Sequence, residues 1–253
     1  MRTFVFAKRN VKEIVRDPLS ALFCIAFPLL LLIVFQIMNG YVPDEVTTFN
    51  LSSLTPGICV FAYSFVMLFT AQLVAKDRTT AFLNRLYTSE MKMYEYVFGY
   101  ALPMIVVAVF QTIVTYFTAF IISLINGDSF SLIGALTSFI GYLPVILLFI
   151  SFGIVFGSMF SEKAAPGISS SVISASAFLS GAWMPLETMG GFCTFCKCLP
   201  FYPAVTVGRT LFSRVEVSFD NLWLSLLTVL LYTATLIVIG MITFKVKTTS
   251  DNK

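Results

Sequence analysis

The chain has 253 residues, of which 58% are hydrophobic and 11% are charged, and its mean hydropathy is +0.90. Because soluble domains carry roughly 25% charged residues, this composition leaves too little polar surface for a water-soluble globule. The net charge of +3 reflects where lysine and arginine lie along the chain and does not indicate nucleic-acid binding. We therefore expect one membrane domain over residues 1–253, with the lipid bilayer as a partner and no nucleic acid.

Six stretches of more than twenty residues carry no Asp, Glu, Lys or Arg. A helix of about 20 residues crosses a ~30 Å hydrocarbon core and satisfies its own backbone hydrogen bonds there. These stretches predict an all-α membrane protein with six transmembrane helices. We place the spans near residues 20–38, 54–74, 98–125, 132–159, 166–183 and 222–243.

Lysine and arginine are distributed unevenly around these spans. Thirteen of the sixteen precede the first span, lie in the second-to-third or fourth-to-fifth connection, or follow the sixth span. Since cytoplasmic loops retain positive charge, the pattern predicts a multi-pass membrane protein with both termini in the cytoplasm. A cleaved signal peptide fits less well, because the apolar segment from Leu19 to Met38 is longer than a signal core and no small-x-small site follows it.

The segment before the first span has an apolar and a charged side. The apolar side carries Phe4, Val11, Ile14 and Val15, and the charged residues Lys8, Arg9, Lys12 and Glu13 lie elsewhere. This pattern predicts an interfacial helix over residues 1–17 in the headgroup plane, ended by Asp17 and Pro18. An ordinary polar lead-in to the first span is the alternative.

The stretch between the fifth and sixth spans is too long for a turn and too apolar for a solvated loop. Its helical pattern is interrupted at Gly190, Gly191, Pro200 and Pro203. We predict a re-entrant helical hairpin over residues 186–215 on the external side. Three cysteines lie in it, so a disulfide between Cys193 and Cys198 is possible, and unpaired thiols are the alternative. No fourth ligand of a suitable type lies close enough for a metal site.

Residues 76–96 mix both signs of charge with apolar side chains. A helix from about Thr79 to Leu86 with one apolar side suits docking onto a soluble partner, and a solvated loop is equally consistent.

Within the fourth and fifth spans, small residues recur at intervals of four. This spacing predicts close helix packing, with a hydroxyl-lined path as the alternative. The pairs are Gly153 and Gly157, Ser171 and Ala175, and Ser176 and Ser180.

Several chemistries are missing from the sequence. The chain has no His, and no predicted span needs to contain an ionisable residue. Ion-coupled carriers usually depend on intramembrane charges, so a secondary carrier is disfavoured, although a sodium site built from carbonyls and hydroxyls remains possible. No phosphate-binding loop or activated nucleophile is present, which predicts a non-enzyme with no catalytic residues and no cofactor in this chain.

Four stretches resemble the ABC-2 type permeases, the membrane subunits of type V ABC exporters such as bacterial multidrug and daunorubicin-resistance systems. They are FAKRNVKEIVRDPLS, LVAKDRTTAFLNRLYTSEMKMYEYVFGYALP, FGSMFSEKAAPGISS and SGAWMPLETMGGFCTFCKCLPFYPAV. The resemblance implies a second permease subunit, in a homodimer or a heterodimer, and a separate ABC ATP-binding subunit that holds ATP and Mg. It also implies an ATPase contact within segment 76–96, at or near Asp77, Arg78, Thr79, Thr80, Leu83 and Arg85.

The resemblance implies export across a plasma membrane, with a pathway at the interface between two permeases. An apolar or amphiphilic cargo suits such a pathway, because nothing charged is available to coordinate an ion or a sugar. We expect it to be lined by aromatic and hydroxyl residues of the second and fifth spans: Phe61, Phe65, Phe69, Ser170, Ser174 and Phe178. The alternatives are export of a lipid-linked glycan, an ATP-independent carrier or channel, and a membrane scaffold or immunity factor without transport.

Overall fold

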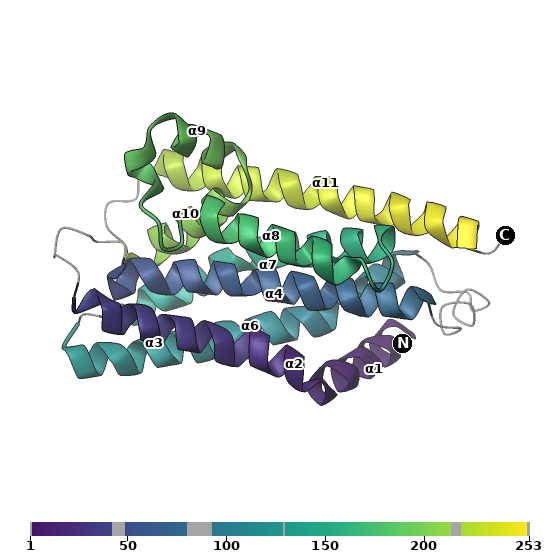
Figure 1. The fold of residues 1–253 in the computed structure, drawn as a ribbon, viewed down its shortest axis with the longest axis horizontal. Coiled ribbons are helices and arrows are strands. Elements are labelled where there is room, and N and C mark those ends of the chain that lie inside the picture. Colours follow the sequence, from purple (N-terminus) through teal and green to yellow (C-terminus); the bar gives the residue numbers. More distant parts are fainter. Residues whose placement is uncertain (1, 42–48, 80–92, 129, 214–218, 252–253) are drawn as a thin grey trace.

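The structure is a computed structural model that describes residues 2–41, 49–79, 93–128, 130–213 and 219–251. All regular structure in these ranges is helical, which confirms the predicted all-α membrane protein (Figure 1). The elements are α1 (Arg2–Arg16), α2 (Pro18–Ala21), the π-helical turn η1 (Leu22–Ala26), α3 (Phe27–Asn39), α4 (Leu51–Thr79), α6 (Met93–Asn126), α7 (Leu132–Met159), α8 (Ala165–Leu179), the 3-10 turn η3 (Leu186–Met189), α9 (Gly191–Cys198), α10 (Phe201–Ser213) and α11 (Phe219–Asp251).

Five helical segments of the described chain are long and apolar enough to cross a membrane. They are Leu22–Asn39, Leu51–Arg78, Tyr94–Asn126, Leu132–Met159 and Leu222–Thr243. The predicted span near 166–183 forms the shorter apolar helix α8, whose 15 residues rise about 22 Å. Pro166 stands in the first turn of α8, and Gly181 follows its end with a φ of +68°, a conformation that glycine adopts without steric cost.

The bundle has two distinct ends. α1 and the last residues of α11 lie at one end, and α9 lies at the other (Figure 1). We call the first the terminus end and the second the hairpin end. The predicted hairpin region contains η3, α9 and α10, and α10 packs against α4 and α7.

α4 forms the centre of the bundle and packs against α3, α6, α7, α8 and α10. The side chains of α4 itself are buried on all its sides, among them Leu54, Tyr63, Met67 and Val74. A helix that is apolar all round belongs in an interior. α3 and α11, in contrast, expose large apolar side chains such as Ile37 on their outer faces, as expected of helices that face lipid.

Close contact between α4 and α7 depends on two glycines. A Cβ atom on Gly153 would lie 2.5 Å from Cβ of Thr70, and one on Gly157 would lie 2.6 Å from the carbonyl oxygen of Ala71. This confirms the packing interpretation of that pair. In α8, Ser176 is buried whereas Ser171 is exposed, so only part of its small-residue pattern packs against neighbours.

The cysteines of α9 are free thiols in this structure, which agrees with the unpaired alternative and not with the possible disulfide between Cys193 and Cys198. The two residues are five positions apart on one helix, which places their side chains in different directions. Cys193 is buried and Cys198 is exposed. Cys196 is also a buried free thiol.

Candidate functional site

Asp77 occupies the last turn of α4 at the terminus end, and its side chain is only 1% exposed. Arg9 of α1 donates from both terminal nitrogens to the two carboxylate oxygens of Asp77, each at 2.8 Å. The hydroxyl of Tyr100 on α6 donates to Oδ2 of the same carboxylate at 3.0 Å. A single buried acid therefore joins three helices that are distant in sequence.

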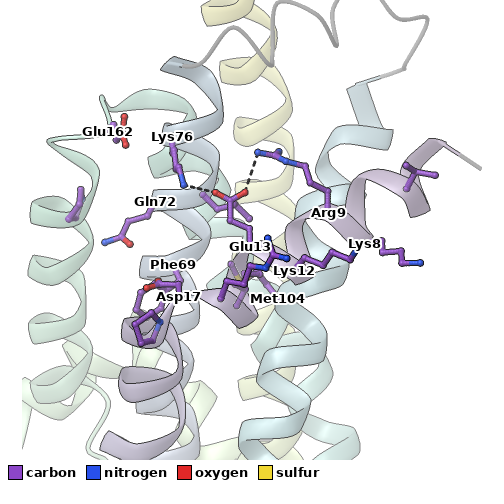
Figure 2. A pocket seen from close by; sticks show the side chains of 16 residues that line it. Lys8, Arg9, Lys12, Glu13, Asp17, Phe69, Gln72, Lys76, Met104 and Glu162 are labelled. Carbon is purple, nitrogen blue, oxygen red and sulfur yellow. Dashed lines mark hydrogen bonds and ion pairs between the residues drawn. The ribbon is translucent and has the colours of Figure 1, made fainter.

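The Asp77–Arg9 pair continues into a chain of charges. Nη2 of Arg9 lies 3.1 Å from Oε2 of Glu13, one turn along α1. Oε1 of Glu13 accepts a hydrogen bond from Nζ of Lys76 on α4 at 2.6 Å. Figure 2 shows Glu13 between Arg9 and Lys76. The hydrogen bond to Asp77 raises the pKa of the Arg9 guanidinium, although partial burial acts in the opposite direction.

Arg78 connects α4 to α7. Its guanidinium donates to the carbonyl oxygens of Gly157 and Phe160, at 3.0 and 3.3 Å, and also to that of Ser158. The last carbonyls of a helix lack partners within the helix, and the helix dipole makes them attract a cation. Arg78 therefore caps the C-terminal end of α7.

α1 is held against the beginning of α6 by apolar contacts as well as by charge. The Phe6 ring meets the Tyr100 ring edge-on with centroids 4.9 Å apart, and Gly99 leaves room for it. Asn10 is buried and donates to the carbonyl oxygen of Gly99 at 3.1 Å. Residues on both sides of segment 80–92 are thus close to α1: Asp77, three positions before it, and Tyr96, four positions after it, whose ring contacts Phe6.

The structure describes only some of the residues predicted to contact an ATPase. Asp77 and Arg78 bind other helices of this chain, and α4 ends at Thr79. Thr80, Leu83 and Arg85 lie outside the described residues. Arg9 and Tyr100 are partners of Asp77 that the sequence did not predict. The spacing of Arg9 and Glu13 predicts a pair within α1, but it gives no signal for a contact with Asp77.

The residues predicted to line a pathway fall on two different surfaces. Phe61, Phe65 and Phe69 are buried on α4. The Phe61 ring lies 4.7 Å from the ring of Trp183, and the Phe65 ring stacks on Phe23 at 5.6 Å. The first span and the turn after α8 therefore cover Phe61 and Phe65, whereas Phe69 lines a groove beside α1.

The second predicted set lies on the outer face of α8. Ser170 and Ser174 are exposed, and Phe178 is 57% exposed. The opposite face of α8 carries the buried Ser169 and Ser176. One copy of the chain thus presents the hydroxyl row outward and does not bring it to the phenylalanine row of α4.

Comparison with models of protein families matches residues 1–213 to the family described as ABC-2 type transporter. The match includes α1, the Asp77 site, α8 and the hairpin region, and it ends at the last residue of α10. A search of curated proteins finds no match to this chain. The four stretches noted in the sequence all lie inside the matched residues. The chain therefore belongs to the ABC-2 type transporter family, whose members are the multi-pass membrane subunits of ABC transporters.

Proposed function

We propose that this chain is a permease that exports an apolar or amphiphilic molecule, such as a drug, a peptide antibiotic or a lipid-like compound, across the plasma membrane. A separate ATP-binding subunit hydrolyses ATP and contacts segment 76–96. The observation that carries this proposal is the anchoring of both ends of that segment, through Asp77 and Arg78 at its start and through Tyr96 at its end, with Tyr100 one turn beyond. A displacement of the segment would therefore move several helices together.

Transmission from the ATPase would follow these anchors. Closure of the ATPase pair on ATP favours one arrangement of the membrane helices, which is a shift of population between two states. Asp77 and Arg9 would pass a displacement of the α4 end to α1, and Arg78 would pass it to α7. Asp77 and Arg78 act in this scheme as positioning residues, because their side chains bind within the chain.

The cargo assignment is supported by the outer face of α8. Ser170, Ser174 and Phe178 present hydroxyls and an aromatic ring but no charge. A second permease copy or a similar subunit facing this row would enclose a pathway between two such faces. Those walls suit an amphiphile, since hydroxyls satisfy a few polar groups while the rest of the cargo contacts apolar surface.

The orientation supported by the charge distribution puts the terminus end in the cytoplasm. The cations of α1 lie at that end with the last turns of α4 and α7, and lysine and arginine are retained on the cytoplasmic side. The candidate ATPase contact would then face the compartment that supplies ATP.

Reconstitution with the ATP-binding subunit tests the proposal. In proteoliposomes, we expect apolar compounds to stimulate ATP hydrolysis by the complex. Asp77→Asn should reduce the stimulated rate about tenfold, in the range of ordinary coupling energies. Asp128→Asn is a matched control, because Asp128 is an exposed acid in the connection between α6 and α7. The proposal fails if only a lipid-linked glycan stimulates hydrolysis, or if the chain moves solute on an ion gradient without an ATPase.

A further inference from the structure

A groove of about 1150 Å³ opens at the terminus end between α1, α4 and the start of α8. Lys8 and Lys12 lie along α1 on one side of it, and Gln72 and Phe69 lie on α4 on the other (Figure 2). Pro166 of α8 also lines it. Phe69 of the predicted pathway and Arg9 of the Asp77–Arg9 pair also line it, but the roles described above for these two residues explain neither the volume of the groove nor its lysines.

The α1 side of the groove carries a row of cations. Lys8, Lys12 and Arg16 follow Phe4 at intervals of four residues, so the four are neighbours along one face of the helix. Phe4 is 73% exposed and lies with the cations, not on the apolar side predicted from the sequence. The three cations are exposed, and none has an ion-pair partner among the described residues. Like charges at this spacing repel one another, so a bound anion would stabilise the row.

The acidic residues that line the groove have other interactions. Glu13 lies between Arg9 and Lys76, with ion-pair contacts to both. Asp17 accepts the backbone N–H of Leu19 and thereby caps α2. Glu162 lies across the groove from Lys8 and beyond Lys76 (Figure 2). The α1 side therefore keeps its positive charge toward the opening.

Beneath the cations the groove is apolar. Phe69 and Leu73 of α4 and Met104 of α6 line it, and all three are buried. Leu19 and Leu22 continue from the end of α1 with exposed apolar side chains. A soluble anion would gain nothing from these surfaces, whereas an amphiphile can place its phosphate on the cations and its glycerol and acyl groups against the apolar residues.

We propose that this groove binds the headgroup of an anionic phospholipid, with its phosphate on Lys8, Lys12 and Arg16. Basic grooves between membrane helices on the cytoplasmic side suit acidic headgroups. The lipid would bridge α1 and α4 directly beside the Asp77–Arg9 pair and so hold α1 in its docked position. Binding itself does not require the export activity proposed above.

Native mass spectrometry of the purified full chain tests the site without the ATP-binding subunit. In micelles containing equal amounts of phosphatidylglycerol and phosphatidylcholine, we expect the wild type to retain phosphatidylglycerol preferentially. The double variant Lys8→Gln/Lys12→Gln should weaken phosphatidylglycerol binding about 30-fold, since each cation near an anionic lipid contributes about fivefold.

Matched charge loss elsewhere separates a specific site from general attraction. Lys163→Gln/Lys197→Gln removes the same charge at two exposed positions that do not line the groove, and it should leave retention unchanged. Equal losses in both double variants would overturn the proposal, as would equal retention of the two lipids by the wild type. Displacement of phosphatidylglycerol by free glycerol phosphate at equal concentration would show a simple phosphate site and would also overturn it.

Discussion

Arginines hold the two ends of α4 in similar ways, but the surroundings differ. At the terminus end, Arg78 donates to carbonyls at the end of α7, and the neighbouring Asp77 pairs with Arg9. At the hairpin end, Arg209 of α10 donates to the carbonyl of Ser53 at 3.0 Å and to the carbonyls of Gly181 and Ala182, each at 2.9 Å. At the hairpin end, the arginine binds backbone carbonyls of the neighbouring segments. At the terminus end, an ion pair between two side chains adds to such bonds.

This difference suggests which end moves. Backbone carbonyls keep their positions as long as the helix ends stay together. Arg209 therefore fixes α10, the start of α4 and the turn after α8 in one arrangement. The Arg9 side of the ion pair is 36% exposed, so water can take over its hydrogen bonds, and separating this pair costs less than separating a fully buried one. We therefore expect α1 and the end of α4 to shift during transport while the hairpin end stays fixed.

The substitution Asp77→Ala should have the largest effect and tests the terminus end directly. It removes the acceptor of both Arg9 and Tyr100 and should lower the free energy of unfolding by about 2–3 kcal/mol, less than for a fully buried pair because Arg9 can be hydrated. Chemical unfolding in mixed micelles measures this change. In the double variant Arg9→Gln/Asp77→Asn, part of the loss should be recovered, because neither residue leaves an unpaired charge.

The sequence predicts the spans well because charge is excluded from hydrocarbon, so uncharged intervals mark them. It predicts less about which surface each residue meets. Phe61, Phe65 and Phe69 share one face, as do Ser170, Ser174 and Phe178, because both sets follow helical spacing. Only tertiary packing determines that the first set is covered and the second is exposed.

The Asp77–Arg9 pair could not be predicted from the sequence for a related reason. The two residues are 68 positions apart, and their contact depends on how α1 lies on α6. Phe6 and Asn10 fix that position against Gly99, and no local pattern in the sequence specifies such a contact.

Glycine substitutions compare the packing of the two ends. A Cβ atom on Gly157 would lie 2.6 Å from the carbonyl oxygen of Ala71, and one on Gly57 would lie 2.8 Å from that of Ala182. We expect Gly157→Ala and Gly57→Ala each to reduce the free energy of unfolding by about 1–2 kcal/mol, with the larger loss at Gly157. Gly167→Ala is the control, because a Cβ there meets nothing within 4 Å. A loss for Gly167→Ala equal to the other two would show that close packing is not the cause.

A smaller effect is expected from Arg209→Lys at the hairpin end. An ammonium cannot reproduce the fork that reaches the carbonyls of Ser53 and Gly181 together, so stability should fall by about 1 kcal/mol. Drug-stimulated ATP hydrolysis should remain close to wild type, since this end is expected to stay fixed. The corresponding Arg78→Lys should reduce stimulation as well as stability. If Arg209→Lys uncouples the complex more than Arg78→Lys does, the assignment of the moving end is reversed.

The smallest effect on stability and transport is expected from substitutions of the cysteines of α9. Their labelling shows which side of the membrane the hairpin end faces. Cys198 is exposed, whereas Cys193 and Cys196 are buried, and a thiol reacts only where a reagent can reach it. A membrane-impermeant maleimide added to intact cells should label the wild type, and Cys198→Ser should remove the label without changing stability or transport. Cys196→Ser should leave labelling intact. Labelling that requires permeabilised membranes would place the hairpin end in the cytoplasm, and the Asp77 site would then lie on the side away from ATP, which is incompatible with coupling through α4.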